Sequence, residues 1–198
     1  RSAGATFPAH PKQFMTDKRL RGRIALVTGA SRGIGRAVAR RFAAEGASLI
    51  LVARTSGGLE EADDDVRSAG GEPAMLVPLD ICQGNLVDQL GAALHERFGR
   101  LDILVGNAAM LGGLRPVGHY PPDVWEDVIA LNLTANWRLI RSLDPLLRLS
   151  DAGRAMFVTS GVTEGTPPAY WGAYTASKAA LEALVRTYAA ELKRSNLK

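Results

Sequence analysis

The chain has 198 residues, of which 46% are hydrophobic and 22% are charged, so collagen-like, disordered and disulfide-scaffold classes are excluded. This length suits one domain with a sizeable core. The 24 basic and 20 acidic residues give a net charge of +4, but the basic residues are spread along the chain without an interleaved aromatic platform, and we expect no nucleic-acid partner.

The beginning of the chain differs from the rest. Residues 1–14 have no apolar period and contain Gly4, Pro8 and Pro11. We interpret this stretch as a tag or a disordered tail. Residues 15–198 are then expected to form a single domain.

From Ile24 onward, short apolar runs alternate with longer segments of helical period. Each run has about the length of a strand and lacks the polar alternation of a sheet with one solvent face. We therefore predict strands that are covered on both faces, at residues 24–28, 48–53, 74–78, 101–105 and 155–159.

The first helix is predicted between the first two strands. Ile34, Val38 and Phe42 recur four residues apart, and Gly46 ends the pattern, as expected for a helix of about three turns.

Four further helices are predicted along the chain, at residues 59–68, 86–98, 124–149 and 169–193. Asn85 is the expected N-cap of the helix at 86–98, and Gly99 is its expected end. Pro145 is expected to interrupt the last turns of the helix at 124–149.

Strands that alternate with helices imply crossover connections, which are right-handed and place parallel strands in one sheet. The predicted fold class is therefore α/β, a doubly wound, Rossmann-like parallel sheet with helices on both faces. Ligands of such folds bind beyond the carboxyl ends of the strands, where the strand order reverses. The residues directly after each apolar run are the candidates for function.

A glycine-rich turn, Thr28-Gly29-Ala30-Ser31-Arg32-Gly33-Ile34-Gly35, joins the first strand to the first helix. Gly29 permits a tight turn, Gly33 lets a pyrophosphate approach bare backbone, and Gly35 lets the helix pack against the sheet. The amino end of a helix favours negative charge. A dinucleotide is therefore the expected ligand.

The T-G-x-x-x-G-x-G spacing of this turn resembles that of the short-chain dehydrogenase/reductase family. Four other motifs stand in family order at the expected strand ends. The resemblance implies the following cofactor-binding residues: Gly29, Ser31, Arg32, Gly33, Ile34, Gly35, Arg54, Asp80, Ile81, Asn107, Ala108, Tyr174 and Lys178. No metal is expected.

The end of the second strand bears on the choice of cofactor. It reads Val52-Ala53-Arg54, without the acid that usually binds the ribose 2′-hydroxyl of NAD. Arg54 and Arg32 could bind a 2′-phosphate by charge-assisted hydrogen bonds, so NADP is favoured and NAD stays possible. A plain surface role for Arg54 stays open.

Asp80 follows the third strand and matches the family position that contacts the adenine edge; a helix or turn cap is the alternative. After the fourth strand the family usually carries Asn-Asn-Ala-Gly, whereas this chain has Gly106-Asn107-Ala108-Ala109. The added methyl of Ala109 puts the local backbone position in doubt.

Tyr174 and Lys178 lie four residues apart, on one face of the last predicted helix. A phenol is a poor acid-base group at neutral pH, and a nearby ammonium stabilises its phenolate. Alone, such a pair is common on amphipathic helices. The resemblance implies that the tyrosine is the general acid or base.

The resemblance supplies two more catalytic candidates. Ser160, just past the fifth strand, would hold a substrate carbonyl and is preferred over Thr159 and Thr163. Asn132 matches a family asparagine that positions a water for a proton relay through Lys178. In an apolar helical stretch such a polar residue would otherwise be an unexplained cost.

The implied activity is that of an NADP(H)-dependent oxidoreductase, which transfers hydride between the nicotinamide and a small carbonyl or alcohol substrate. Two alternatives stay open: an NAD-linked alcohol dehydrogenase, and a non-catalytic NADP(H)-sensing regulatory protein. The runs 150–153 and 171–174 resemble, more weakly, the bacterial YciK-like branch of the family.

Four expectations concern the whole protein. The single cysteine, Cys82, forms no internal disulfide, which favours the cytoplasm, and no apolar run is long enough for a membrane span. The helices at 124–149 and 169–193 form subunit faces in relatives, so a homodimer or homotetramer is expected. The family continues with two more strands and a substrate-covering segment, so the domain is expected to be C-terminally incomplete.

Overall fold

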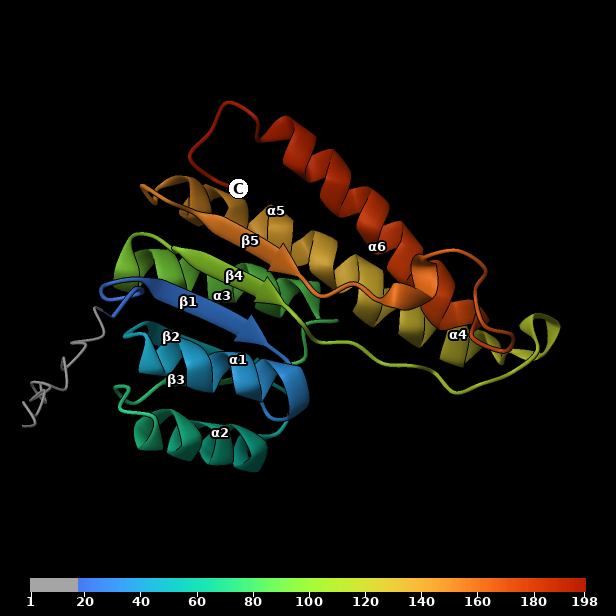
Figure 1. Cartoon of the computed structure of the whole chain (residues 1–198), viewed down its shortest axis with the longest axis horizontal. Coiled ribbons are helices and arrows are strands. Elements are labelled where there is room, and N and C mark those ends of the chain that lie inside the picture. The colour runs from blue at the N-terminus through green and yellow to red at the C-terminus, as the bar shows by residue number, and fades with distance from the viewer. Residues whose placement is uncertain (1–17) are drawn as a thin grey trace, which may run out of the picture.

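The protein forms one parallel sheet, whose strand order in space is β3-β2-β1-β4-β5 (Figure 1). The computed structural model describes residues 18–198, so the tail predicted at 1–14 and the start of the domain at 15 lie outside the described residues. The strands are β1 (Ile24–Thr28), β2 (Ser48–Ala53), β3 (Met75–Pro78), β4 (Ile103–Gly106) and β5 (Arg154–Phe157). The predicted doubly wound α/β fold is confirmed.

The helices that connect these strands are α1 (Gly33–Ala44), α2 (Ser56–Ser68), α3 (Gly84–Phe98), α4 (Pro122–Ile129), α5 (Ala135–Arg148) and α6 (Gly172–Glu191). A π-helical segment (Ala130–Thr134) joins α4 to α5. Short 3-10 turns occur at Val117–His119 and Gly161–Thr163.

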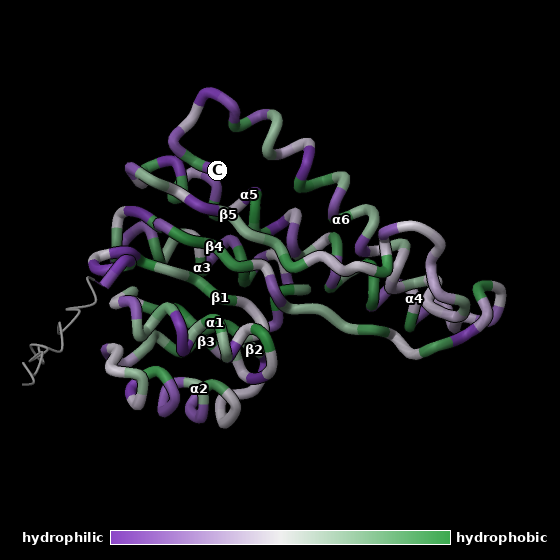
Figure 2. The backbone as a smooth tube through the Cα atoms, in the orientation of Figure 1, coloured by the Kyte–Doolittle hydropathy of each residue, from purple (hydrophilic) through white to green (hydrophobic). Residues whose placement is uncertain are grey.

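Two hydrophobic cores lie on opposite faces of the sheet. On one face, Ala25 and Val27 of β1 pack with the buried sides of α1 and α2. On the other, Leu26 packs with buried leucines of α3 and α5 and with the last turns of α6. The central strands β1 and β4 are correspondingly hydrophobic in colour (Figure 2). Burial on both faces explains why the strand sequences show no polar alternation.

The strand order reverses between β1 and β4. The chain runs from β1 outward to β2 and β3, then crosses back to β4 on the other side of β1. Val27 of β1 is therefore in register with Leu51 of β2 and with Val105 of β4. The turns that follow these three strands meet at one edge of the sheet, where doubly wound folds bind their ligands.

A buried ionic cluster occupies the opposite edge, at the beginnings of the strands. The carboxylate of Asp102 is fully buried and accepts hydrogen bonds from the Ile24 amide at 2.9 Å, Ser150 Oγ at 2.6 Å and Arg23 Nη1 at 3.0 Å. Burial alone would raise the pKa of Asp102, but these hydrogen bonds outweigh it, so the pKa lies below its ordinary value. The cluster ties β1, β4 and the segment before β5 together.

Two details of the predicted helices are wrong. Asn85 is not the N-cap: α3 begins at Gly84, so Asn85 is already helical and the cap position is Gln83. Pro145 does not interrupt the helix at 124–149, because α5 continues through it to Arg148. The interruption is the π-helical segment at Ala130–Thr134.

Some ends of strands and helices also differ from the predicted ones. Strand β4 begins at Ile103 because the Leu101 amide donates to the Leu146 carbonyl rather than to a strand. Helix α6 begins at Gly172, not at 169, because Tyr170 has a left-handed φ of +70° that ends regular structure there. Strand β5 ends at Phe157, two residues before the predicted end.

Candidate functional site

The glycine turn after β1 is tightly packed on one side and open on the other. Gly29 has a φ of +63°, and a Cβ there would lie 2.9 Å from Ala108 Cα. A Cβ on Gly35 would lie 2.4 Å from the Gly29 carbonyl oxygen, whereas a Cβ on Gly33 would meet nothing within 4 Å. Close packing at Gly29 and Gly35 therefore holds the turn, and Gly33 leaves bare backbone at the amino end of α1.

Two side chains from neighbouring strand ends fix this turn in place. Asn107 Nδ2 donates to the carbonyl oxygens of Thr28 and Gly29, at 3.0 and 3.3 Å. The buried Thr28 hydroxyl accepts from the Asn107 and Ala108 amides, at 3.0 and 3.2 Å. Thr28 was not among the predicted site residues, although a polar residue at the end of a buried strand is a signal for such a role.

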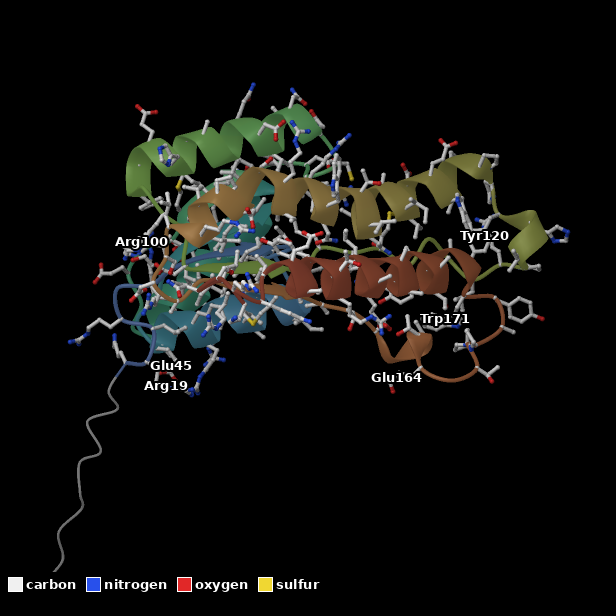
Figure 3. The ribbon with its side chains drawn as sticks, turned by 90° about the horizontal axis from the view of Figure 1, so that it is seen from above. Arg19, Glu45, Arg100, Tyr120, Glu164 and Trp171 are labelled. Carbon is white, nitrogen blue, oxygen red and sulfur yellow. The ribbon has the colours of Figure 1, made fainter. Side chains whose placement is uncertain are left out.

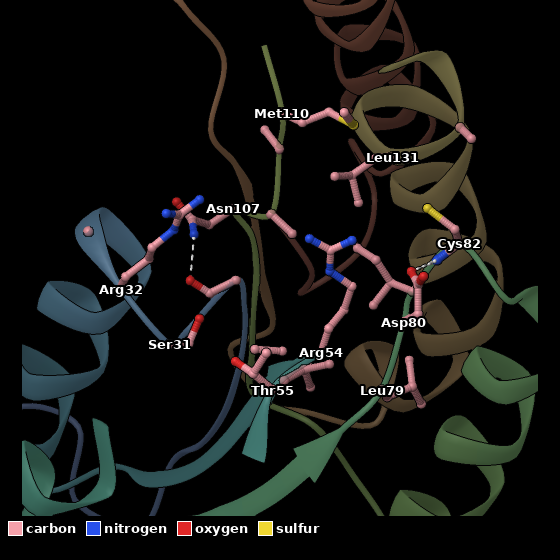
Figure 4. A pocket seen from close by; sticks show the side chains of 18 of the residues that line it. Ser31, Arg32, Arg54, Thr55, Leu79, Asp80, Cys82, Asn107, Met110 and Leu131 are labelled. Atoms are coloured by element: carbon pink, nitrogen blue, oxygen red, sulfur yellow. Dashed lines mark hydrogen bonds between the residues drawn. The ribbon is translucent and has the colours of Figure 1, made fainter. Parts of the chain in front are cut away.

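A cavity of about 670 Å³ opens at this edge of the sheet (Figure 4). Most of the predicted cofactor-binding residues line it: Gly29, Ser31, Arg32, Gly33, Ile34, Arg54, Asp80, Ile81, Asn107 and Ala108. Gly35 lies behind the turn, and Tyr174 and Lys178 are not part of the lining.

Arg54 projects into the middle of this cavity, between Arg32 on one side and Asp80 on the other (Figure 4). Both arginine side chains are exposed, and neither forms an ion pair among the described residues. No acidic residue stands at the end of β2, which reads Val52-Ala53-Arg54. The cavity therefore presents two available cations at this position.

Asp80 caps the turn after β3, since its Oδ1 accepts from the Cys82 amide at 2.9 Å. This contact fits the turn-cap role, and because Asp80 also lines the cavity, the adenine contact stays a prediction. Cys82 also lines the cavity. Burial, together with the charge of Asp80, raises the pKa of the Cys82 thiol to about 11.

The cavity has a second wall, formed by Ala109 and Met110 after β4 and by Asp127, Ala130 and Leu131 of α4 and the π-helical segment. From its position after the fourth strand, Met110 is a candidate for an apolar pocket wall, with core packing as the alternative, and it lines the cavity. Sequence reasoning missed Asp127, Ala130 and Leu131. The face that a helix turns to a cavity depends on tertiary packing, which a single helical pattern does not give.

Tyr174 and Lys178 lie on the same face of α6. Lys178 is only 2% exposed, its Nζ lies 5.9 Å from the centre of the Tyr174 ring, and it donates to the Val158 carbonyl at 2.6 Å. Burial lowers the pKa of Lys178. The ring of Trp171, at the start of α6, meets the ring of Tyr174 edge to face, with 5.9 Å between their centres.

Ser160 lies just beyond β5, in the segment that leads toward α6. Its Oγ accepts from the Val162 amide at 3.4 Å, so the side chain caps the short turn Gly161–Thr163. Glu164 follows this turn, in the loop that leads to Trp171 at the beginning of α6 (Figure 3). Ser160 and Tyr174 are thus joined by one loop and carried by adjacent elements.

Asn132 is fully buried within the π-helical segment. Its side chain accepts from the Met110 amide and donates to the Met110 carbonyl, both at 2.9 Å, and donates to Ser177 Oγ at 3.0 Å. These three hydrogen bonds offset the desolvation free energy of burying this side-chain amide. The predicted water relay through Lys178 stays a prediction.

These contacts link the cavity to α6. Met110 lines the cavity, Asn132 bonds to its backbone, and Ser177 donates to the Tyr174 carbonyl at 2.7 Å. The helix that carries Tyr174 is therefore hydrogen-bonded through two buried side chains to the loop after β4.

Within residues 18–198, no helix combines the length and the apolar character that a membrane crossing requires. Over the same residues, no group of three or more histidine, cysteine, aspartate or glutamate side chains is arranged to hold a metal ion.

The chain matches known proteins over most of its length. A family model described as short chain dehydrogenase matches residues 23–198. The oxidoreductase YciK of Escherichia coli K12 is 38% identical over 184 residues, which are 91% of this chain and 71% of that protein. An NAD-dependent oxidoreductase of Mycobacterium tuberculosis H37Rv, Rv0687, is 38% identical over 87% of this chain and 67% of its own.

Solved structures agree in fold. A short chain dehydrogenase from Escherichia coli CFT073, complexed with NADPH, superposes with a TM-score of 0.86 at 36% identity, covering 92% of this chain and 76% of that one. A short chain dehydrogenase from Shigella flexneri 2a, complexed with NADP, has the same TM-score of 0.86, identity of 36% and coverages of 92% and 76%.

Proposed function

Because the chain belongs to the short-chain dehydrogenase family and is an oxidoreductase of its YciK-like branch, we propose that it transfers hydride between NADP(H) and a small carbonyl or alcohol substrate. Tyr174 acts as the general acid or base. The observation that carries this proposal is the hydrogen-bonded path from the cavity, through Asn132 and Ser177, to the helix of Tyr174 and Lys178.

The cavity residues fit an NADP(H) molecule. The bare backbone at Gly33 leaves room for a pyrophosphate at the amino end of α1. Arg32 and Arg54 line the cavity with no acid at the end of β2, a charge arrangement that suits a 2′-phosphate. Relatives complexed with NADPH and NADP support the same cofactor.

When bound, the nicotinamide supplies or accepts the hydride. Tyr174 gives a proton to the substrate oxygen in reduction and removes it in oxidation, while the Ser160 hydroxyl holds that oxygen. The buried ammonium of Lys178 stabilises the phenolate form of the tyrosine and binds the nicotinamide ribose. Asn132 holds the loop at Met110, and its further role in the proposal is to position a water for the proton relay.

A homodimer or homotetramer whose subunit faces are the helices at 124–149 and 169–193 is part of the proposal, by analogy with relatives, as are a cytoplasmic location and the absence of a nucleic-acid partner. An NAD-linked alcohol dehydrogenase is the second candidate, and the NAD-dependent relatives of Mycobacterium tuberculosis favour it.

Cofactor titration and turnover test the proposal. NADPH and NADH fluorescence titrations are followed by measuring NADPH oxidation with a panel of ketones, aldehydes and quinones. Tighter NADPH binding with turnover of at least one carbonyl supports it. Tighter NADH binding favours the second candidate, and NADPH binding without turnover of any carbonyl or alcohol favours a regulatory sensor.

A further inference from the structure

Ser160 lies between two contacts that both come from α6. Two residues before it, the Val158 carbonyl accepts from Lys178 Nζ at 2.6 Å. Three residues after it, the Thr163 hydroxyl contacts Glu182 Oε1. Lys178 and Glu182 follow Tyr174 by four and eight residues, so all three share one face of the helix.

The contact at Thr163 is the principal restraint on the turn that contains Ser160. Within the described chain, it is the one hydrogen bond that residues 159–169 make to another element. Thr163 Oγ1 also donates to the Ser160 carbonyl at 2.8 Å. A hydroxyl has one proton to donate, so Thr163 shares it between the turn and the helix and thereby connects them.

The Lys178 contact does not isolate the effect of the turn's position. Under the proposed function Lys178 also takes part in the chemistry, so substituting it would change catalysis directly. Glu182 and Thr163 take no part in the proposed chemistry, and both are half-buried, so their contact stays available throughout the reaction.

We propose that Thr163 and Glu182 are a pair of positioning residues, which hold the Ser160 turn against α6 and so set the spacing between Ser160 and Tyr174. This inference rests on the proposed function for its catalytic consequence. The restraint itself is a property of the fold and can be measured without a substrate.

Thr163 offers matched variants. Thr163→Val keeps the shape of the side chain but removes the hydroxyl, and Thr163→Ser keeps the hydroxyl. Thr187→Val is the control. Thr187 is an exposed residue of α6, and its hydroxyl donates only to the Ala183 carbonyl of the same helix, at 3.0 Å. Glu182→Ala removes the other partner, and Glu182→Gln keeps an acceptor oxygen.

Amide hydrogen exchange of peptides that cover residues 158–166 reads the restraint directly. We expect faster exchange in Thr163→Val and Glu182→Ala, and wild-type exchange in Thr163→Ser, Glu182→Gln and Thr187→Val. Unchanged exchange in Thr163→Val would overturn the inference, whether or not the protein turns over any substrate.

Steady-state kinetics measure the effect of this restraint on catalysis. With NADPH and a carbonyl that the wild type reduces, such as a quinone from the panel, Thr163→Val should lower kcat by roughly ten to a hundredfold, because small misplacements of a catalytic group have effects of this size. The Kd for NADPH should not change, and Thr163→Ser should restore most of kcat.

The two proposals fail differently. If the wild type turns over and Tyr174→Phe does not, while Thr163→Val matches the wild type in kcat, only the positioning inference is lost. If no carbonyl is reduced but exchange responds as expected, the proposed function is lost and the restraint stands.

Discussion

The ammonium of Lys178 lies 5.9 Å from the centre of the Tyr174 ring, one helical turn away and almost fully buried. The pair is held by α6 itself, whose buried Ser177 binds both the Tyr174 carbonyl and Asn132. The buried ammonium thus lies at cation–π distance from the ring of the proposed proton donor.

Tyr174→Phe should therefore remove the proton donor while leaving the ring packed against Trp171. We expect kcat for carbonyl reduction to fall by at least about a hundredfold, the lower range for a lost general acid, with NADPH affinity nearly unchanged. Steady-state kinetics and a fluorescence titration measure the two effects.

Tyr188→Phe is the matched control, because it removes a hydroxyl from the same helix far along from Tyr174. The Tyr188 hydroxyl donates to Asp144 at 2.6 Å, so this variant should lose about 1.5 to 3 kcal/mol of stability and keep its kcat. Equal turnover by Tyr174→Phe and the wild type would contradict the mechanism.

Arg54→Ala should weaken NADPH binding and leave NADH binding nearly unchanged. A hydrogen bond to a charged group contributes about 1.5 to 3 kcal/mol, which corresponds to an increase of roughly ten to a hundredfold in the Kd for NADPH. Fluorescence titration with both reduced cofactors measures the change. An equal loss for the two cofactors would show that Arg54 does not bind the 2′-phosphate.

Cys82 should react slowly with iodoacetamide. With a thiol pKa of about 11, fewer than about one thiol in a thousand is ionised at neutral pH, and the thiolate is the reactive form. Alkylation should accelerate as the pH rises toward this pKa, and NADPH should slow it because Cys82 lines the cavity. Mass spectrometry follows the labelling, and Cys82→Ser gives the background.

Asp102→Asn should destabilise the fold by about 3 kcal/mol at pH 7, because the buried carboxylate accepts charge-assisted hydrogen bonds from Arg23, Ser150 and the Ile24 amide, which a neutral amide cannot replace in full. The pKa of Asp102 is lower in the folded than in the unfolded chain, so its contribution is present above the unfolded value, near about 4. It is lost as the pH falls through the folded value.

Urea unfolding at a series of pH values tests this. The difference between the wild type and Asp102→Asn should shrink steadily below about pH 4. A difference that stays constant into strong acid would mean that the carboxylate charge contributes nothing.

Much of the fold could be predicted because its signals are local. The apolar runs that became β1 and β2 are covered on both faces, and they showed it by their lack of polar alternation. The glycine turn carries its own conformational requirement at Gly29, whose φ is positive. The match of the chain to a family of oxidoreductases confirms the class of enzyme that these motifs indicated.

The predictions that were wrong depend on packing between segments that are distant in sequence. Asn85 belongs to a residue type that commonly caps helices, but α3 begins at Gly84, two residues before the predicted start at 86. Pro145 looks like a break, yet α5 continues past it to Arg148, because the proline removes one backbone hydrogen bond while Leu146 and Leu147 after it are buried in the core. The π-helical segment carries no local signal; Asn132 there is satisfied by Met110 and Ser177, which are distant in sequence.

The buried cluster around Asp102 and the cavity beside Gly33 stand at opposite ends of the same strands. The residues that stabilise the fold and the residues that line the cavity thus lie at opposite edges of the same sheet. Stabilising substitutions around Asp102 can therefore offset the stability cost of substitutions that reshape the cavity, because the two sets of residues share no side chain.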